Sequence, residues 1–522
     1  YVQADGLQTI GYDHGDYNVV TNYVKGNNSY TVFAGANYSH VDGTETWNNE
    51  NYQFTQSLFD RESYSKNSYR NHQEYMQFRY QNQKGKRYWV GKFTLVNLST
   101  PRNASSGFAK ESTETDVFSN IRKKSLSPKI DLNANLPLSK NQTLTLGVHG
   151  KYSANSYHRL YQEQPFETMT DEDEKALSFQ LSAIYNYFSQ KHSLSMELFH
   201  YHDVWNADYS GNCELWQHLW KGESLAFFSY NFQASRRLSL KTRIGLDWLQ
   251  YHLHGDNSFS QLSPRINTNV QYQLNKGMLL WSFNFVNSNH GMDVINRAMI
   301  QVNSHMMEKG MPELKKSHDI NTYLYYMGRF NRLSVSAIGQ FRYNHHPVTD
   351  DYYLDEANGK IVKTYSNGGN AQYYSAILAL QYKLCKFANL SGDIRYNHAE
   401  VKTTWSKHNN NLTGNLGLNM FMGDFALKPY LHFGKKSLDE AAWVISKTPI
   451  DYGMSCSYSR GNLYVELQAV SPFKKQEKQY WLDLPIYSYS KSIKDQTASQ
   501  YASIKVAYSF DFGRKTQKVE KD

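Results

Sequence analysis

Two short histidine motifs have the spacing of a metal-binding pair. His200 and His202 form one H-x-H motif, and His252 and His254 form another. Residues i and i+2 of a β-strand point to the same face, so each pair could present two imidazoles to one transition-metal ion. The favoured interpretation assigns them no ligand: they are solvated histidines, or histidines at the edge of the aromatic girdle that lies at a membrane interface. We therefore expect no metal site.

A pair of tryptophans marks a second candidate region. Trp216 and Trp220 lie in residues 212–221, which we expect to form a loop on the long-loop side of the protein. Their rings could stack on a sugar or a haem-like ligand, or pack on a partner protein. Packing within the loop is the simpler alternative. Trp216 and Trp220 are therefore candidate extracellular ligand or partner residues.

Two adjacent histidines complete this candidate set. His345 and His346 precede Asp350 and Asp351 by a few residues, a combination of side chains that could bind a ligand or a metal ion. We expect the segment to be an exposed extracellular loop. His345 and His346 are thus further candidates for contact with a ligand or partner.

The sequence contains no motif that predicts catalysis. It has no G-x-S-x-G, no H-E-x-x-H and no Gly-rich phosphate loop in a strand–turn–helix context. We therefore predict that the protein is not an enzyme and carries no cofactor.

Two other segments are conspicuous in composition. Residues 287–316 contain several methionines, which suit adaptable contact surfaces. A small helix tucked against the rim is the preferred interpretation. The acidic run 171–174 is expected to be a solvated loop tip.

The dominant pattern along the chain is a period-two alternation of apolar and polar residues. In residues 502–512, for example, Ile504, Val506 and Tyr508 alternate with Lys505 and Ala507. Such alternation predicts strands with one apolar face. Each apolar face spans roughly ten residues, about the length with which a tilted strand crosses a bilayer.

Ten short polar segments separate these strands in pairs, and they read as hairpin turns rich in Gly and Asn. They are residues 25–28, 82–85, 138–141, 189–192, 235–237, 275–277, 329–332, 383–389, 422–424 and 459–462.

Longer polar connections lie between successive turns, and we expect them to be loops. They include residues 43–71, 99–124, 158–174, 287–316, 344–370 and 472–499. Short turns on one side and long loops on the other are typical of outer-membrane barrels. Ten turns join twenty strands, and the C-terminal strand adds one. Residues 1–9 could supply another, which gives twenty-two, the strand number of barrels with a plugged lumen.

Composition agrees with this class. Aromatic residues make up 15% of the chain, Pro occurs only 11 times, and the charged fraction is 20%. No stretch approaches the ~18 apolar residues of a membrane-spanning helix. The net charge is +9, but Lys and Arg are scattered, so nucleic-acid binding is not expected. The three cysteines lie far apart and form neither a zinc motif nor a disulfide framework.

The predicted fold is all-β: a large antiparallel transmembrane β-barrel of about 22 strands with short periplasmic turns and long extracellular loops. We expect residues 1–513 to form the barrel and residues 514–522 a short basic periplasmic tail. The predicted location is the bacterial outer membrane, as an integral protein.

Several short motifs resemble a known family. The end of the chain, V-A-Y-S-F-D-F-G-R-K at 506–515, resembles the final strand of Bacteroidota TonB-dependent receptor-type outer-membrane barrels. Residues 310–318, G-M-P-E-L-K-K-S-H, resemble the G-N-P-x-L-K-P motif of that family, which leads into a strand. Here Met311 replaces the Asn and Lys316 the second Pro. The L-S-P tripeptides at 126–128 and 262–264 match the family's strand openings.

The resemblance implies an N-terminal plug domain and a segment that engages TonB. Neither precedes Tyr1, which is not an initiator Met and follows no signal peptide. We therefore expect either a processed chain or a fragment, or a barrel that has lost its plug.

The leading functional hypothesis is a TonB-dependent-type transporter barrel for nutrient uptake, with a substrate that the sequence does not specify. The alternatives are a non-enzymatic subunit of a larger outer-membrane complex, for secretion, assembly or lipoprotein docking, and a passive pore. The expected partners are outer-membrane lipids and lipopolysaccharide, a plug domain and TonB, and a surface lipoprotein or other outer-membrane subunits.

Overall fold

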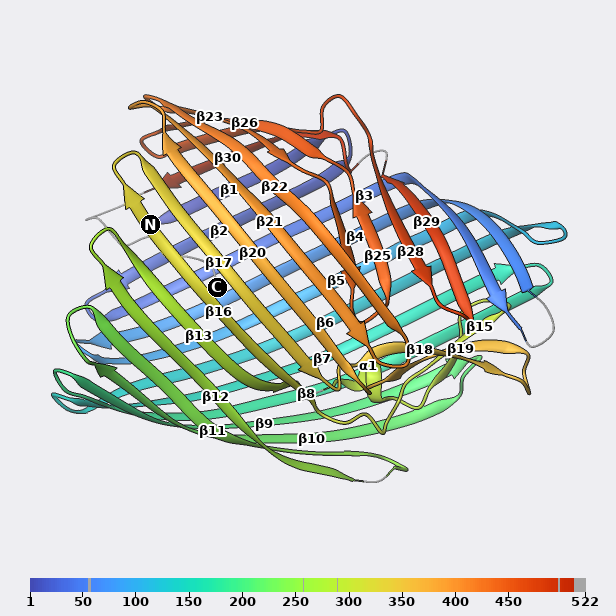
Figure 1. The fold of residues 1–522 in the computed structure, drawn as a ribbon, viewed down its shortest axis with the longest axis horizontal. Coiled ribbons are helices and arrows are strands. Elements are labelled where there is room, and N and C mark those ends of the chain that lie inside the picture. Colours follow the sequence, from blue (N-terminus) through green and yellow to red (C-terminus); the bar gives the residue numbers. More distant parts are fainter. Residues whose placement is uncertain (55–57, 257, 289, 496–497, 511–522) are drawn as a thin grey trace.

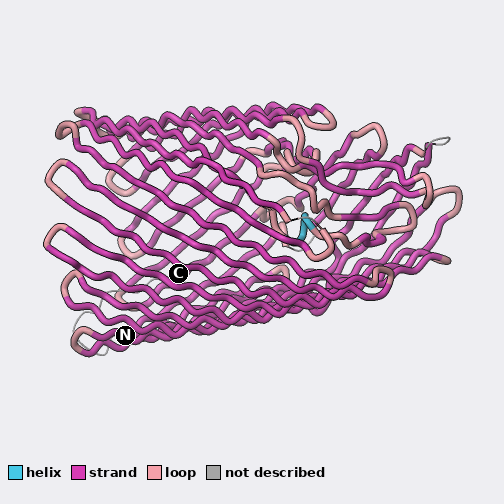
Figure 2. The backbone as a smooth tube through the Cα atoms, turned by 90° about the horizontal axis from the view of Figure 1, so that it is seen from below, coloured by secondary structure: helices cyan, strands magenta, loops and turns pink. Residues whose placement is uncertain are grey.

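Pairing between the first and last strands closes the sheet into a barrel. In the computed structural model, strand β1 (Val2–Ile10) pairs antiparallel with β30 (Tyr501–Phe510), so that Val2 lies opposite Phe510. Closure joins 22 antiparallel strands into one wall (Figures 1 and 2). The structure describes residues 1–54, 58–256, 258–288, 290–495 and 498–510. The predicted fold class is confirmed, and the first nine residues do supply a strand.

The other wall strands follow one another around the ring in chain order. They are β2 (Asp13–Lys25), β3 (Asn28–Gln53), β4 (Leu58–Lys84), β5 (Arg87–Lys110), β6 (Glu114–Ser139), β7 (Gln142–Glu163), β8 (Phe166–Phe188), β9 (His192–Gly211), β10 (Leu215–Gln233), β11 (Leu238–Leu253), β12 (Phe259–Leu274), β13 (Gly277–Ser288), β16 (Ser317–Phe330), β17 (Leu333–His345), β20 (Asn370–Lys383), β21 (Ala388–Lys402), β22 (Ser406–Met422), β23 (Phe425–His432), β26 (Asp451–Arg460) and β27 (Leu463–Val470).

Apolar side chains on alternate positions form a belt around the outside of the barrel. Met76 on β4 is 54% exposed, Leu198 on β9 is 59% exposed and Ile394 on β21 is 61% exposed. A continuous ring of such residues suits hydrocarbon rather than water. Because the wall closes on itself, no backbone edge faces the lipid. We call this ring the apolar belt.

All ten predicted hairpin turns lie between consecutive strands at one end of the barrel, the end at which β1 begins and β30 ends (Figure 2). Gly26 and Gly85 in two of these turns have φ values of 61° and 60°, a region that favours glycine. Short turns mark the periplasmic end of outer-membrane barrels, so the opposite end faces the exterior.

The wall continues far beyond the belt at the exterior end. Strand β4 has 27 residues, about 90 Å of chain, whereas about ten residues suffice to cross a bilayer. The long connections predicted at 43–71, 99–124 and 158–174 are present at the exterior end, but most of each is paired strand rather than loop. Their polar composition marks the exit from the membrane, while backbone pairing continues above it.

Two further hairpins extend the wall where β1 and β2 are short. They are β24 (Lys435–Asp439) with β25 (Val444–Thr448), and β28 (Gln476–Asp483) with β29 (Tyr487–Asp495). Strand β25 pairs with β28, and β29 pairs with β3. The wall is thus continuous above the belt on this side too (Figure 1).

No helix among the described residues is long and apolar enough to cross a membrane. The predicted basic tail, 514–522, lies outside the described residues.

Candidate functional site

Two long connections fold together into a small second sheet at the exterior end. The β13–β16 connection contributes α1 (Met292–Ile295), β14 (Met299–Gln301) and β15 (Met306–Lys309). The β17–β20 connection contributes β18 (Thr349–Asp355) and β19 (Lys360–Ser366), and β15 runs parallel to β19. We call these five elements the cap. The helix expected within 287–316 is α1, so that prediction is confirmed.

One flank of the cap packs on the strands on one side of the barrel. Met306 and Ile361 belong to a buried cluster with Tyr52 of β3, Val401 of β21 and Trp443, which follows β24. Ile361 and Trp443 are completely buried. The cap therefore bridges the inner faces of strands that are not neighbours in the ring.

The other flank packs on a different part of the wall. Met292 and Ile295 of α1 are buried with Leu219 of β10 and with Leu249 and Leu253 of β11. Both leucines of β11 alternate with Trp248, which is exposed on the outside, so they face the lumen. Because its two flanks rest on separate strand groups, the cap lies across the exterior opening of the lumen (Figure 1).

A buried ion-pair group fixes the end of the first connection to the wall. Lys316 Nζ lies 2.8 Å from Oδ2 of Asp247 on β11, and both side chains are fully buried. Arg265 Nη2 on β12 lies 2.6 Å from the same Asp247 oxygen and 3.1 Å from Oε1 of Glu223 on β10. Two cations thus face two carboxylates, with Lys316 and Asp247 fully buried and Arg265 and Glu223 slightly exposed. Lys316 is one of the two residues at which the chain departs from the motif that it resembles, and its buried contacts point to a structural role for it.

A second buried group surrounds Arg61 of β4. Arg61 lies 2.8 Å from Glu163 of β7 and 3.4 Å from Glu50 of β3, and it is only 4% exposed. It also donates a hydrogen bond to the hydroxyl of Tyr161. Burial lowers the pKa of Arg61, but Tyr161 and these two carboxylates outweigh it and the pKa is raised, so Arg61 stays cationic.

The cap makes direct contact with this group. Ser304 donates a hydrogen bond to Glu163 at 3.0 Å, and His305 Nε2 lies 2.8 Å from Glu111, which also faces Arg61 at 3.6 Å. Arg159 of β7 donates to the backbone carbonyl oxygens of Gln301 and Val302. The β14–β15 turn is therefore held at several points.

An ion pair also joins the strands of the cap. Lys363 Nζ of β19 lies 3.2 Å from Glu308 of β15 and 3.3 Å from Asp350 of β18. Burial lowers the pKa of Lys363, but the two carboxylates outweigh it and the pKa is raised. Burial raises the pKa of Asp350, and Lys363 opposes that shift.

A small acidic chamber lies between the cap and the wall. It has a volume of 230 Å³, and its lining includes Glu172, Glu174, Asp293 and Glu308. Tyr209 of β9 donates a hydrogen bond to Glu172 at 3.0 Å. Burial raises the pKa of Glu172.

This placement corrects the expectation for the acidic run 171–174. The run is not a loop tip but part of strand β8. Alternation turns Glu172 and Glu174 inward, whereas Asp171 faces outward and pairs with His158.

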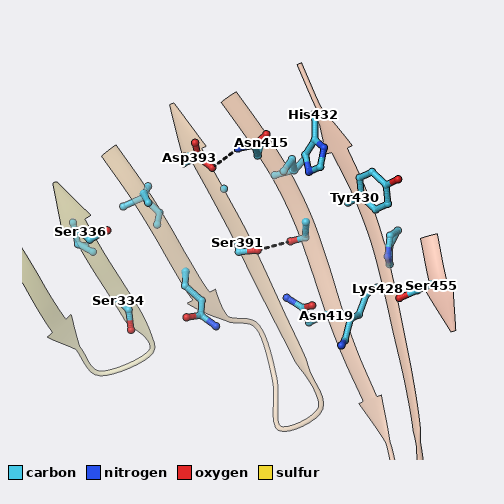
Figure 3. Close-up of a pocket in the computed structure, with 18 of the residues that line it drawn as sticks. Ser334, Ser336, Ser391, Asp393, Asn415, Asn419, Lys428, Tyr430, His432 and Ser455 are labelled. Atoms are coloured by element: carbon cyan, nitrogen blue, oxygen red, sulfur yellow. Dashed lines mark hydrogen bonds between the residues drawn. The ribbon is translucent and has the colours of Figure 1, made fainter. Parts of the chain in front are cut away.

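The inner wall nearer the periplasmic end is polar. A depression of 620 Å³ crosses strands β16 to β27, and its lining includes Ser336, Ser391, Asn415 and Asn419 (Figure 3). Asn415 donates a hydrogen bond to Asp393 at 2.8 Å (Figure 3). Small hydroxyl and amide side chains provide many donors and acceptors to whatever occupies the lumen.

The candidate tryptophans lie on the outside of the wall. Only residues 212–214 separate β9 from β10, so the predicted loop 212–221 is mostly strand and that prediction is wrong. Trp216 and Trp220 share a face with Phe228, which belongs to the apolar belt. Trp220 Nε1 donates to His202 Nε2 at 3.1 Å, and Trp216 contacts His254 edge-on. The alternation of apolar residues along β10 could have predicted that Trp216 and Trp220 point outward.

The H-x-H pairs line the same outer surface. His200 and His202 stand beside β10, and His252 and His254 stand on β11. His200 contacts Ser224, and His252 contacts Ser258. Among the residues that the structure describes, no three His, Cys, Asp or Glu side chains are placed to hold a metal ion.

His345 and His346 lie where β17 ends. Their rings are 3.9 Å apart, and His345 Nδ1 lies 2.9 Å from Asn370 Oδ1. His346 has a φ of 58°, and its backbone carbonyl accepts a hydrogen bond from Ser317. Asp350 instead belongs to the cap, where it faces Lys363. The structure thus separates side chains that are close in sequence.

Comparisons with known proteins agree with this architecture. No family model and no curated protein matches the sequence. Solved structures do match in fold. They include a structure described as the copper transporter OprC (TM-score 0.68, 10% identity, covering 98% of this chain and 80% of that one). The siderophore receptor PiuA from Acinetobacter baumannii matches with a TM-score of 0.63 and 10% identity, over 97% of this chain and 81% of that one.

The FrpB iron transporter from Neisseria meningitidis (F3-3 variant) is also similar, with a TM-score of 0.60 and 8% identity, over 97% of this chain and 81% of that one. At such identities the likeness concerns the fold. The chain is an integral outer-membrane barrel. Its closed wall, apolar belt and short periplasmic turns all agree with that location.

Proposed function

We propose that this chain is the barrel of a TonB-dependent-type transporter that takes up a scarce nutrient, with the cap as its outer gate and no catalytic activity. The observation that carries the proposal is the cap itself. A wide barrel whose exterior opening is crossed by a folded sheet, held by buried ion pairs, suits regulated passage of a solute. The structural neighbours named as transporters and receptors support this class.

The polar inner wall supports a plug below the cap. A 22-stranded lumen is wide enough to need one, since barrels of this size are plugged. Side chains such as Ser336, Ser391 and Asn419 could hold a folded domain through hydrogen bonds. We propose that a plug, on this chain or on another, occupies the lumen and is moved by TonB.

The cap also argues against a passive pore. A large open lumen conducts ions steadily, whereas Lys316 and the Arg61 group hold the cap across this one. A subunit role in a larger complex is the remaining alternative, and purification can test it.

The test uses the protein purified from native outer membranes. We expect an intact mass or a co-purifying chain that accounts for a plug of more than about one hundred residues, and no steady conductance in planar bilayers. Uptake of one nutrient should fail when the gene is deleted or when the TonB system is inactivated. A large steady conductance would identify a pore. Several unrelated outer-membrane proteins in the preparation, with uptake unaffected by the deletion, would identify a complex subunit.

A further inference from the structure

Four cationic side chains gather on the outer face of three neighbouring strands. They are Arg70 of β4, Arg102 of β5, and Arg122 and Lys124 of β6, and all four are exposed. Arg70 lies directly opposite Arg102 in the β4–β5 register. Arg122 lies opposite the irregularity of β5 that contains Arg102. We call these four residues the basic patch.

The alternation of the strands shows that the patch faces outward. On β6, Lys124 and Arg122 continue the face of Leu126 and Ile130, which belong to the apolar belt. On β4, Arg70 is an even number of residues from Met76, another belt residue. The residue beside each arginine faces inward: Lys123 stacks over Tyr157 inside the barrel.

The patch begins where the belt ends on the exterior side. Lys124 and Arg122 precede Leu126 by two and four residues and lie about 7 and 13 Å farther along the strand toward the exterior. With a strand tilt near 45°, that corresponds to roughly 5–9 Å of height, within the headgroup layer of the outer leaflet.

The four cations have no charged partner among the described residues. Within the part of the chain that the structure describes, their side chains make no ion pair and no hydrogen bond. Interior cations differ, since Arg61, Arg265 and Lys316 all face carboxylates. Like charges directly opposite each other in a sheet are destabilising, so the Arg70–Arg102 pair is unfavourable unless an anion bridges it.

Two neighbouring carboxylates on the same face are already engaged, whereas the exposed Asp173 lies two strands away from Lys124. Glu74 accepts a hydrogen bond from Asn97, one strand away. Asp171, two strands from Arg122, pairs with His158. The patch therefore keeps its positive charge at its centre.

We propose that the basic patch binds the phosphate groups of a phosphorylated glycolipid of the outer leaflet. Guanidinium groups bind phosphate oxygens in bidentate fashion, and three of the four cations are arginines. Clustered cations beside a membrane surface are a recognised arrangement for anionic headgroups. Acyl chains of the same lipid would lie against Leu126, Ile130 and Met76 of the belt. One molecule would thus meet the charged patch and the apolar belt together.

The test compares lipid retained by the full protein after extraction in mild detergent. The test variant is R70Q/R102Q/R122Q/K124Q. The control is K140Q/R236Q/R237Q/K276Q, which removes the same charge from exposed positions at the periplasmic turns. Native mass spectrometry should show a phosphorylated glycolipid on the natural protein and the control, and at least about ten-fold less on the test variant. The heat-dependent mobility shift of folded barrels in gel electrophoresis verifies that each variant folds.

Binding to defined vesicles separates the sources of phosphate. We expect the natural protein to prefer vesicles of diphosphorylated lipid A over the dephosphorylated lipid, with weaker binding at high salt. R70K/R102K/R122K keeps the charge but loses bidentate geometry, and should bind with intermediate strength. Equal retention by test variant and control, equal binding of dephosphorylated lipid, or competition by inorganic phosphate alone at millimolar concentration would overturn the proposal. An acidic protein co-purifying in place of lipid would overturn it as well.

Discussion

Lys316 Nζ lies 2.8 Å from Oδ2 of Asp247, and neither side chain is exposed to solvent. Lys316 ends the cap connection, while Asp247 belongs to the wall. This contact joins the proposed gate to the fixed frame of the barrel. Breaking a buried ion pair by removing one partner is costly because a charge is left uncompensated.

The two halves of this pair should not be equivalent. Asp247→Asn leaves Lys316 buried without a carboxylate partner, and we expect a loss of about 3–5 kcal/mol of stability and release of the connection. Lys316→Met should cost less, about 1–3 kcal/mol, because Arg265 still neutralises Asp247. Arg297, Lys309 and Lys315 lie in this connection, so faster trypsin cleavage after them would measure its release from the wall. Equal cleavage of both variants and of the natural protein would show that the pair does not hold the cap.

The Arg61 group predicts a second route to cap opening. Arg61→Met leaves Glu50 and Glu163 facing each other in a buried site, so both the β14–β15 turn and the hairpins around it should loosen. We expect a loss of about 3–5 kcal/mol of stability, seen as a lower thermal unfolding midpoint in detergent. We also expect larger fluctuations of the conductance. Lys140→Gln, at an exposed turn, is the matched control. Unchanged conductance with normal folding would contradict a gating role.

The chamber carboxylate Glu172 predicts a pH dependence. Burial raises its pKa above the ordinary value of 4.5, so the folded state holds the proton more tightly than the unfolded chain does. The charged form therefore costs stability at neutral pH, and that cost vanishes as the pH falls below 4.5. Glu172→Gln should be at least as stable as the natural protein at pH 7, with the difference closing by pH 4. Unfolding midpoints across this range measure it, with the exposed Glu214→Gln as control. A natural protein that loses stability relative to the variant on acidification would reverse the sign and contradict the prediction.

Cysteine labelling tests the orientation. Cys385 lies in the short turn between β20 and β21, at the periplasmic end. In a C213S/C456S background, an impermeant thiol reagent should label Cys385 only after the outer membrane is permeabilised. Adding Asn358→Cys at the β18–β19 turn should give labelling on intact cells. Immediate labelling of Cys385 on intact cells would invert the proposed topology.

The wall could be predicted because its signal is local. Alternation along residues 502–512 and the ten turns depend on neighbours in sequence, and the structure confirms every turn. The form of the exterior segments could not be predicted in the same way. Polar residues such as those of 43–71 occur equally in loops and in strands above a membrane, and only pairing with a distant strand distinguishes them.

The interior contacts escaped prediction for a related reason. Arg61 and Glu163 are 102 residues apart, and nothing near either shows that they share a side of the wall. The parity of Trp216 and of Glu172, by contrast, follows from the apolar residues of the same strands. Counting from Phe228 or Leu177 assigns one side chain to the outside and the other to the lumen. The outward direction of the candidate tryptophans and of the H-x-H histidines is therefore a property that residue parity within each strand can predict.

The pairing of Val2 with Phe510 also sets the order of assembly. These partners are separated by almost the whole chain, so the first strand has an unpaired edge until the last one has been made. Contacts of such sequence separation form late and slowly because the intervening chain must first be ordered. An unfinished barrel has two exposed backbone edges, which neither lipid nor a crowded compartment tolerates well. The seam thus makes insertion depend on a chain that is complete through β30.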